Sequence, residues 1–246
     1  MRFSPAEVER YARHLVLAEI GGPGQQKLAD ATVAIVGAGG VGGPAALYLA
    51  AAGVGTLRLI DGDVVSLSNL QRQIAFDTAD IGRSKIEAAS DRLGAINPHV
   101  RVEGLDHPLI PENAAELLAG ADVVLDGTDS FATRHAVNAA CVAAGIPLVS
   151  GALGRWSGQV GVFLGRPCYR CLVPDIPTDE ETCARVGVVG ALAGVVGAMA
   201  ALETIKLITG AGQPLTARLL LYDGLSATSR TVTVTSDPAC PVCAVT

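Results

Sequence analysis

The chain has 246 residues, enough to bury a substantial core in one large domain or in a domain with an appendage. Hydrophobic residues make up 50% of it but aromatic residues only 4%, so we expect an aliphatic core. The formal net charge of -6 and the lack of a Lys or Arg run argue against a nucleic-acid partner. The N-terminus shows no hydrophobic signal segment, and we therefore expect a cytoplasmic protein.

Predicted helices alternate with predicted strands over residues 1–150. A capping box formed by Ser4 and Glu7 starts a helix over residues 7–19, Gly and Pro at 21–23 end it, and a short helix follows at 25–29. Strands are predicted at 33–36, 56–60, 100–105, 122–125 and 146–150, and helices at 41–52, 84–93, 111–119 and 131–144. This alternation predicts an α/β fold with a doubly wound, Rossmann-like and mostly parallel sheet.

The pattern changes after residue 150. Strands predicted at 158–164, 219–222 and 231–235 indicate an antiparallel extension of the same sheet. Residues 186–202 carry no charge, but 17 residues rich in Gly and Ala favour a packed core helix over a membrane span. We therefore expect a single domain over 1–246, with N-terminal helices at 1–30, a nucleotide-binding part at 31–150 and the antiparallel extension at 151–246.

A glycine motif joins the first predicted strand to the helix that follows it. Gly37, Gly39 and Gly42 form G-x-G-x-x-G, in which glycines let backbone amides approach phosphate oxygens at a helix N-terminus. Asp61, at the end of the second strand, lies where an acidic residue binds an adenosine ribose. The motif predicts a nucleotide or dinucleotide site, and a glycine-rich turn without a ligand is the alternative.

Two C-x-x-C pairs are separated by a long stretch of chain. Cys168 and Cys171 form the first pair, and Cys240 and Cys243 form the second. Four thiolates suit a closed tetrahedral zinc site, which would fasten the C-terminal tail to the body of the protein. Two disulfides or a redox-active pair are the alternatives.

A long loop at 62–82 is rich in polar groups, and its length indicates a function. Asn69 and Arg72 in this loop, with Lys85 after it, would converge on a nucleotide triphosphate and neutralise charge that develops on phosphorus. Asp129, after the fourth strand, would hold magnesium. Solvated loop charges without a ligand are the alternative.

These motifs together resemble the MoeB/ThiF family, the bacterial relatives of ubiquitin-activating enzymes. The resemblance covers nearly the whole chain, and it is specific because several weak motifs recur in one order. It is carried by Arg13 in residues 11–14, the turn at 37–42, the loop at 68–73, Gly82 with Lys85, residues 126–130 and the paired cysteines.

The resemblance implies that the substrate is a small ubiquitin-like sulfur carrier protein ending in Gly-Gly. Its C-terminal carboxylate would attack the α-phosphate of ATP and give an acyl adenylate and pyrophosphate. None of the four histidines lies in a recognisable catalytic arrangement. A carboxylate is already ionised near neutral pH, so the reaction needs no general base and depends on alignment and phosphate electrostatics.

The resemblance also assigns roles to individual residues. Gly40 and Asp61 would bind the nucleotide, Asp129 would hold magnesium, and Arg13 would reach the ATP of the partner subunit in a homodimer. Asn69, Arg72 and Lys85 would contact the phosphates. The remaining nucleotide-binding residues would be Gly37, Gly39, Gly42, Asp63, Ser68, Leu70, Gln71 and Ser130. The chain departs from the family at 127–130, where many relatives carry Cys-Thr-Asp-Asn, but Asp129 is retained.

The branch within the family remains open at this point. The loop at 68–73 and the N-terminal helix favour the MoeB type, which acts on a MoaD-like carrier, and the ThiF type, which acts on ThiS, is the alternative. Cys183 is either a packing residue or a nucleophile that captures the carrier. The chain ends soon after Cys243, so a separate sulfurtransferase or cysteine desulfurase would supply sulfur. An NAD-dependent oxidoreductase and a noncatalytic zinc-containing binding module are more distant alternatives.

Overall fold

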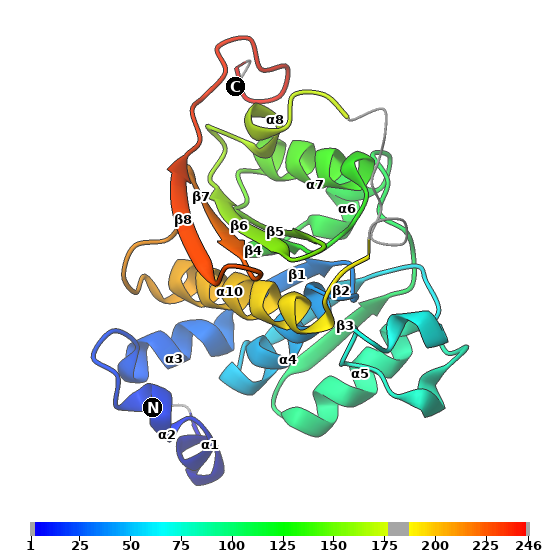
Figure 1. The fold of residues 1–246 in the computed structure, drawn as a ribbon. Helices are drawn as coiled ribbons and strands as arrows, with labels where there is room; N and C mark the ends of the chain where they lie inside the picture. Colours follow the sequence, from blue (N-terminus) through cyan, green and yellow to red (C-terminus); the bar gives the residue numbers. More distant parts are fainter. Residues whose placement is uncertain (1–2, 177–186, 245–246) are drawn as a thin grey trace.

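One eight-stranded sheet forms the centre of the protein, and helices cover both of its faces (Figure 1). A computed structural model describes residues 3–176 and 187–244. The strand order is β3-β2-β1-β4-β5-β6-β7-β8. The strands are β1 Thr32–Val36, β2 Thr56–Ile60, β3 Arg101–Leu105, β4 Val123–Asp126, β5 Leu148–Gly154, β6 Ser157–Phe163, β7 Arg218–Asp223 and β8 Thr228–Thr233.

The first five strands are parallel to one another, and β6, β7 and β8 continue the sheet in antiparallel pairs. The predicted parallel sheet with an antiparallel extension is thus confirmed. The helices are α1 Pro5–Arg10, α2 Ala12–Leu15, α3 Gly21–Asp30, α4 Gly42–Ala52, α5 Lys85–Ile96, α6 Ala114–Leu118, α7 Phe131–Ala144, α8 Tyr169–Leu172 and α10 Gly190–Thr209, with 3-10 turns η1 Leu67–Asn69 and η2 Thr78–Asp80 in the long loop.

The core lies on both faces of the sheet because side chains alternate along each strand. Val33 and Ile35 of β1 pack with α4, α5 and α10 on one face. Ala34 and Val36 pack on the other face with α6 and α7. Both faces of the central strands are therefore aliphatic, as expected for parallel strands covered by helices on each side.

The N-terminal region differs from its prediction. The expected helix over 7–19 is divided at Tyr11 into α1 and α2, and the Tyr11 hydroxyl accepts a hydrogen bond of 2.9 Å from Asn97. Gly21 and Pro23 do not end this helix but begin α3. Proline is tolerated there because the first amides of a helix have no partner within the helix.

The long apolar helix is a partly buried core helix. Of the described residues, those of α10 alone form a helix long and apolar enough to cross a membrane. This helix packs against α4, β5 and β6, and Val196 and Ala200 on it are fully buried. It runs past the predicted end at residue 202 to Thr209, where Gly210 caps it with a φ of 80°. The predicted start at residue 186 lies outside the described residues.

Candidate functional site

A cavity of about 460 Å³, here called the strand-end cavity, opens where β1, β2 and β4 end. The chain leaves β1 in one direction toward β2 and β3, and returns to β4 on its other side. Ligands of doubly wound sheets bind at such a switch point. Nine of the predicted site residues line the cavity: Gly37, Gly39, Gly40, Asp61, Asp63, Arg72, Lys85, Asp129 and Ser130.

The glycine turn forms the floor of the strand-end cavity. Gly37 has a φ of 86°, which favours glycine, and the amides of Gly39, Gly40 and Val41 have no hydrogen-bond partner among the described residues. These free donors precede the N-terminus of α4, where the helix dipole favours an anion. Gly42 does not line the cavity, because it is buried against Gly37, where a methyl group would overlap the Gly37 carbonyl.

Asp61 and Lys85 form the charged wall of the cavity. Asp61 accepts hydrogen bonds from the amides of Ala38, at 2.8 Å, and Asp63, at 2.9 Å. Lys85 Nζ lies 2.7 Å from Asp63 Oδ2 and 3.6 Å from Asp61 Oδ2. Burial raises the pKa of Asp61, and the nearby Lys85 charge opposes that rise. The Lys85 ammonium is itself buried, so it is a cation held in place toward the cavity.

The long loop contributes two side chains to the cavity. Arg72 Nη1 donates to the Ser68 carbonyl at 2.9 Å, which orients its guanidinium. Gln73 is buried, and its Oε1 has no hydrogen-bond partner among the described residues. Of the other predicted loop residues, Asn69 accepts a hydrogen bond from Ser66 N at 3.2 Å, and Ser68, Asn69, Leu70 and Gln71 do not line the cavity.

Asp129 lies in the loop between β4 and α7 and is exposed at the cavity rim. Ser130 caps α7 by accepting a hydrogen bond from Thr133 N at 3.4 Å. Arg134 and Tyr169 are among the lining residues that sequence analysis did not select. Arg134 lies four residues after the helix cap, and this position could have indicated that it is near the cavity. Tyr169 lies between the cysteines of a C-x-x-C pair, and this position suggested only a structural role.

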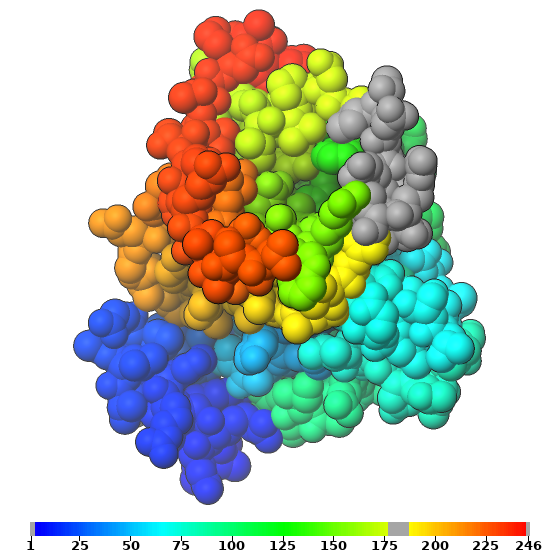
Figure 2. All heavy atoms as spheres, viewed as in Figure 1, coloured from blue at the N-terminus to red at the C-terminus, as the bar shows by residue number. Residues whose placement is uncertain are grey.

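Arg13 does not line the strand-end cavity of its own chain. It is exposed on α2, and Tyr11 and His14 attach this part of the chain to Asn97 and Gln25. The N-terminal helices project at the end of the molecule opposite the C-terminal tail (Figures 1 and 2). A role for Arg13 in catalysis therefore requires the site of another chain.

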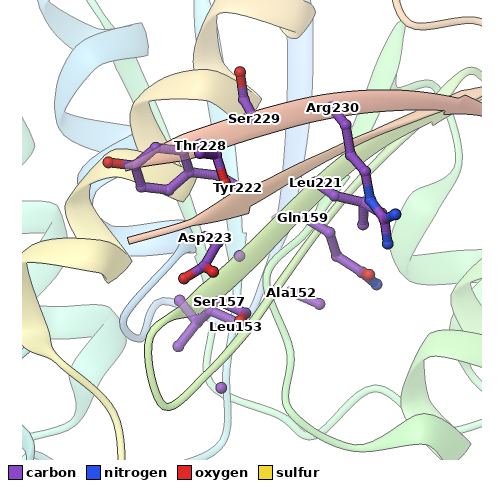
Figure 3. A pocket seen from close by; sticks show the side chains of 12 residues that line it. Ala152, Leu153, Ser157, Gln159, Leu221, Tyr222, Asp223, Thr228, Ser229 and Arg230 are labelled. Atoms are coloured by element: carbon purple, nitrogen blue, oxygen red, sulfur yellow. The ribbon is translucent and has the colours of Figure 1, made fainter. Parts of the chain in front are cut away.

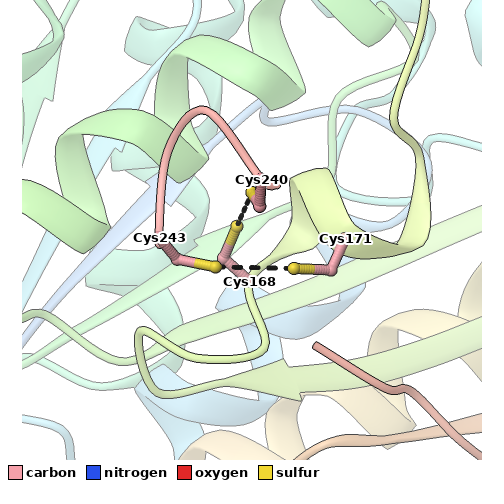
Figure 4. Close-up of side chains that lie close together, drawn as sticks. All are labelled: Cys168, Cys171, Cys240 and Cys243. Atoms are coloured by element: carbon pink, nitrogen blue, oxygen red, sulfur yellow. Dashed lines mark hydrogen bonds between the residues drawn. The ribbon is translucent and has the colours of Figure 1, made fainter. Parts of the chain in front are cut away.

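The four cysteines of the C-x-x-C pairs meet between α8 and the C-terminal tail (Figure 4). Their sulfurs all lie within 4.8 Å of one another, with Cys168 and Cys240 3.7 Å apart and Cys171 and Cys243 3.4 Å apart. A tetrahedral site with Zn–S bonds of about 2.3 Å separates its sulfurs by roughly 3.8 Å. The cluster therefore fits zinc, and all four cysteines are free of disulfides.

Cys141 is not part of this cluster. Cys141 is buried in α7, and burial raises the pKa of its thiol to about 12 with a further contribution from Asp126. Such a thiol is inert at neutral pH. Cys183, the predicted covalent candidate, lies outside the described residues.

A second cavity of about 840 Å³, here called the sheet-edge cavity, lies over β5 to β8. Strand pairing places Gln159 opposite Leu221, and Leu221 opposite Arg230, so these side chains lie on one face of the sheet. Figure 3 shows Gln159 and Arg230 extending toward the same side. Ala152, Leu153 and Gln159 line both cavities, so the two cavities share a wall.

A Rossmann-like sheet, a free-amide turn at its switch point and a four-cysteine cluster define a nucleotide-binding α/β enzyme. Residues 11–242 match the ThiF family, and the chain belongs to this family. It is 46% identical to a sulfur carrier protein adenylyltransferase of Thermus thermophilus, over 99% of this chain and 93% of that protein. The chain is an adenylyltransferase, as the resemblance implied.

Other relatives carry more specific names. The chain is 47% identical to the sulfur carrier protein ThiS adenylyltransferase of Escherichia coli, over 95% of this chain and 94% of that protein. It is 44% identical to the molybdopterin-synthase adenylyltransferase of Escherichia coli, over 98% of both chains. Among solved structures, E. coli MccB with AMPCPP and MccA has a TM-score of 0.82 at 26% identity, covering 95% of this chain and 74% of that one.

Proposed function

We propose that the protein adenylates the C-terminal Gly-Gly carboxylate of a ubiquitin-like sulfur carrier protein, with ATP as the second substrate. The observation that carries this proposal is that free amides, the cations of Arg72 and Lys85 and the Asp129 carboxylate surround one cavity. This arrangement suits a nucleotide triphosphate, whose negative charge would lie between the glycine turn and the side chains of Arg72 and Lys85.

In this mechanism the carrier carboxylate attacks the α-phosphorus of ATP, and pyrophosphate leaves. Asp61 would accept the ribose hydroxyls, because its carboxylate, with the side chain only 9% exposed, faces the cavity beside the glycine turn. The amides of Gly39 and Gly40, with Arg72 and Lys85, would hold the phosphates in line. No side chain has to remove a proton, since the attacking carboxylate is already ionised.

Two metal ions fit residues of this chain. Asp129 would hold Mg²⁺, which neutralises charge on the leaving pyrophosphate when it is bound. The four-cysteine cluster would hold Zn²⁺, and its closed set of sulfur ligands indicates a structural ion. Asn138 and the amide of Asp237 each donate to a cluster sulfur at 3.5 Å, as expected around thiolates.

The sheet-edge cavity provides a path for the carrier tail. Because Ala152, Leu153 and Gln159 line both cavities, an extended tail over β5 to β8 would end at the α-phosphate. A tail without bulky side chains, such as Gly-Gly, suits the passage between two cavities. The carrier body would then rest on the antiparallel edge of the sheet.

The proposed assembly is a homodimer in which Arg13 acts on the partner's nucleotide. The exposed position of Arg13, away from the cavity of its own chain, supports this arrangement. An apolar stripe on α10, which includes Val195 at 37% and Leu202 at 60% exposure, offers a face for a second copy. Sulfur would then reach the activated carrier from a separate sulfurtransferase or cysteine desulfurase.

We favour a MoaD-like carrier of molybdopterin synthase over ThiS. The loop at 68–73 and the N-terminal helices support this choice, whereas identities of 44% and 47% to the two kinds of E. coli enzyme do not separate them. Cys183 is expected not to take part in adenylation.

The test is carrier-dependent exchange of labelled pyrophosphate into ATP, with a MoaD-like and a ThiS-like protein as candidate carriers. We expect exchange with the MoaD-like protein, and none with either carrier after its terminal glycine is removed. Exchange with ThiS alone would reassign the carrier. No exchange with any Gly-Gly carrier, together with NAD reduction, would instead support an oxidoreductase.

A further inference from the structure

The Arg134 guanidinium is buried in the wall of the strand-end cavity, where it connects three backbone segments. The residue is 6% exposed. Its Nη2 donates to the carbonyls of Thr128 and, at 3.0 Å, Gly151, and its Nη1 lies 3.4 Å from Ser150 Oγ. A buried guanidinium is unfavourable unless its donors find acceptors, and here those acceptors belong to the β4–α7 loop and to β5. Arg134 therefore fixes this loop against the sheet.

The loop that Arg134 holds is the one that carries Asp129. Thr128 is held a second time, because its amide and hydroxyl donate to Asp126 Oδ1 at 3.0 Å and 2.7 Å. The Asp129 carboxylate itself has no hydrogen bond or ion pair within residues 3–176 and 187–244. Its position at the cavity rim consequently depends on the backbone of Thr128.

Tyr169 is a neighbour of Arg134 and lies between the two cysteines of the first C-x-x-C pair. The Tyr169 side chain is buried, and burial raises the pKa of its hydroxyl while the charge of the neighbouring Arg134 opposes that rise. Its ring packs edge-on against Phe163 with centroids 5.8 Å apart. Its amide donates to Asn138 Oδ1 at 2.8 Å, and Asn138 Nδ2 donates to Cys168 Sγ at 3.5 Å. The Tyr169 backbone is thus connected through Asn138 to Cys168 of the cysteine cluster.

We propose that Arg134, supported by Tyr169 of the cysteine pair, is a positioning residue that fixes the Thr128–Asp129 segment at the cavity. The cysteine cluster then does more than fasten the C-terminal tail, because it also orders one wall of the active site. The effect on catalysis rests on the proposed role of Asp129 in holding Mg²⁺. The effect on the loop does not, since it follows from the hydrogen bonds alone.

The test uses Arg134→Lys, which keeps the charge but loses the fork of donors, and Tyr169→Phe, which removes only the hydroxyl. We expect backbone amides at 127–131 to exchange with deuterium at least about tenfold faster in Arg134→Lys, and less so in Tyr169→Phe. In carrier-dependent pyrophosphate exchange, kcat should fall on the order of tenfold to a hundredfold in Arg134→Lys, because misplacement of a catalytic group by about 1 Å has effects of this size. The half-saturating Mg²⁺ concentration should rise, with KM for ATP nearly unchanged.

Arg58→Lys is the matched control. Arg58 also donates to two loop carbonyls, those of Ala119 at 2.7 Å and Leu117 at 3.2 Å, but it does not line either cavity. The Arg58→Lys variant should keep the wild-type Mg²⁺ dependence of activity and the wild-type rate of deuterium exchange at residues 127–131. If Arg134→Lys does not fold, deuterium exchange at residues 127–131 and the Mg²⁺ dependence of activity are measured on Tyr169→Phe, and these two results test the proposal.

Two results would overturn the proposal. The first is wild-type deuterium exchange at 127–131 in either variant. The second is full additivity of the kcat effects in the double variant, because residues that act through one contact are coupled. A wild-type protein without carrier-dependent exchange would refute the proposed function instead, and deuterium exchange would still report on the loop.

Discussion

Gly197 of α10 lies against the backbone carbonyl of Val41, so closely that a methyl group at position 197 would come within 2.6 Å of that oxygen. Val41 is the residue that joins the glycine turn to α4. The long apolar helix therefore supports the phosphate-facing turn from behind. This contact exists only because residue 197 has no side chain.

We expect Gly197→Ala to destabilise the protein and to weaken ATP binding. The overlap with a backbone atom can be relieved only by moving α10 or the start of α4, and overpacking of this kind costs about 1–3 kcal/mol. Urea unfolding and KM for ATP measure the two effects. Gly194→Ala on the same helix is the control, since a methyl group there meets nothing within 4 Å and should leave KM unchanged. Equal behaviour of the two variants would show that the contact has no role.

A pH-dependent stability difference is expected between the wild type and Asp61→Asn. Burial raises the folded-state pKa of Asp61 above its usual value of 3.8, so the folded protein binds this proton more tightly than the unfolded chain does. The stability that Asp61 contributes is therefore fully present below pH 3.8 and is lost as the pH rises through the raised pKa. The wild type should lose stability relative to Asp61→Asn over that interval.

Urea unfolding at a series of pH values measures this difference. The exposed Asp106→Asn variant is the reference for the general effect of removing one negative charge. A difference between wild type and Asp61→Asn that stays constant with pH, or that grows in favour of the wild type, would contradict the expected direction.

The central strands could be predicted because each is a short aliphatic run bounded by polar or glycine residues. β1 shows this best, since its buried residues alternate between two covered faces. The break at Tyr11 could not be predicted, because it accompanies a hydrogen bond to Asn97, 86 residues away. Local sequence favours one continuous helix there, and a tertiary contact decides otherwise.

The candidate site likewise contains residues that could be predicted from the sequence and residues that could not. Gly37, Asp61 and Asp129 stand at strand ends, so their motifs could be placed at one edge of the sheet from the sequence. Arg134 was not selected, because its position four residues after a helix cap does not by itself distinguish a cavity residue from one packed within the helix. Gln73 was one of several polar residues in the long loop, and the sequence does not separate it from the others. The shared wall of the two cavities depends on strand pairings such as Gln159 with Leu221, which the sequence did not specify.

Zinc is expected at one ion per chain, and Cys240→Ser should lower both zinc content and stability. The variant removes one of four ligands, and the tail beyond β8 would lose its attachment to α8. Metal analysis and limited proteolysis of the tail measure these effects. Cys141→Ser is the control, because this buried thiol lies outside the cluster and its replacement should reduce stability while zinc content stays the same. Full zinc occupancy in Cys240→Ser would refute the site.

Lys85→Met is expected to lower carrier-dependent exchange by on the order of a hundredfold or more, which is typical for removing a preorganised group that stabilises charge. Lys85 is buried between Asp61 and Asp63, so its charge is fixed toward the cavity. Lys27→Met is a suitable control, because Lys27 binds the Thr209 carbonyl at 3.0 Å and lines neither cavity. Wild-type exchange in Lys85→Met would remove Lys85 from the proposed phosphate site.

The last prediction concerns Arg13 and Asp129, which would belong to different chains in each working site. Arg13→Ala and Asp129→Ala homodimers should each have little exchange activity, because the first removes a cation that would act on the phosphates and the second removes the carboxylate that would hold Mg²⁺. In a mixed dimer, one of the two sites combines an intact Asp129 with an intact Arg13 from the other chain. Mixing the variants should therefore restore activity, up to about a quarter of the wild-type level if subunits redistribute at random and each intact site works independently.

Subunit redistribution has to be shown first, with differently tagged chains that are recovered together. Mixing Asp129→Ala with the double variant Arg13→Ala/Asp129→Ala is the control, because no combination of those chains contains an intact Asp129. Recovery only in the first mixture would place Arg13 in the partner's site. If tagged chains redistribute and activity does not recover, Arg13 acts within its own chain or not at all, and the exposed position of α2 needs another explanation.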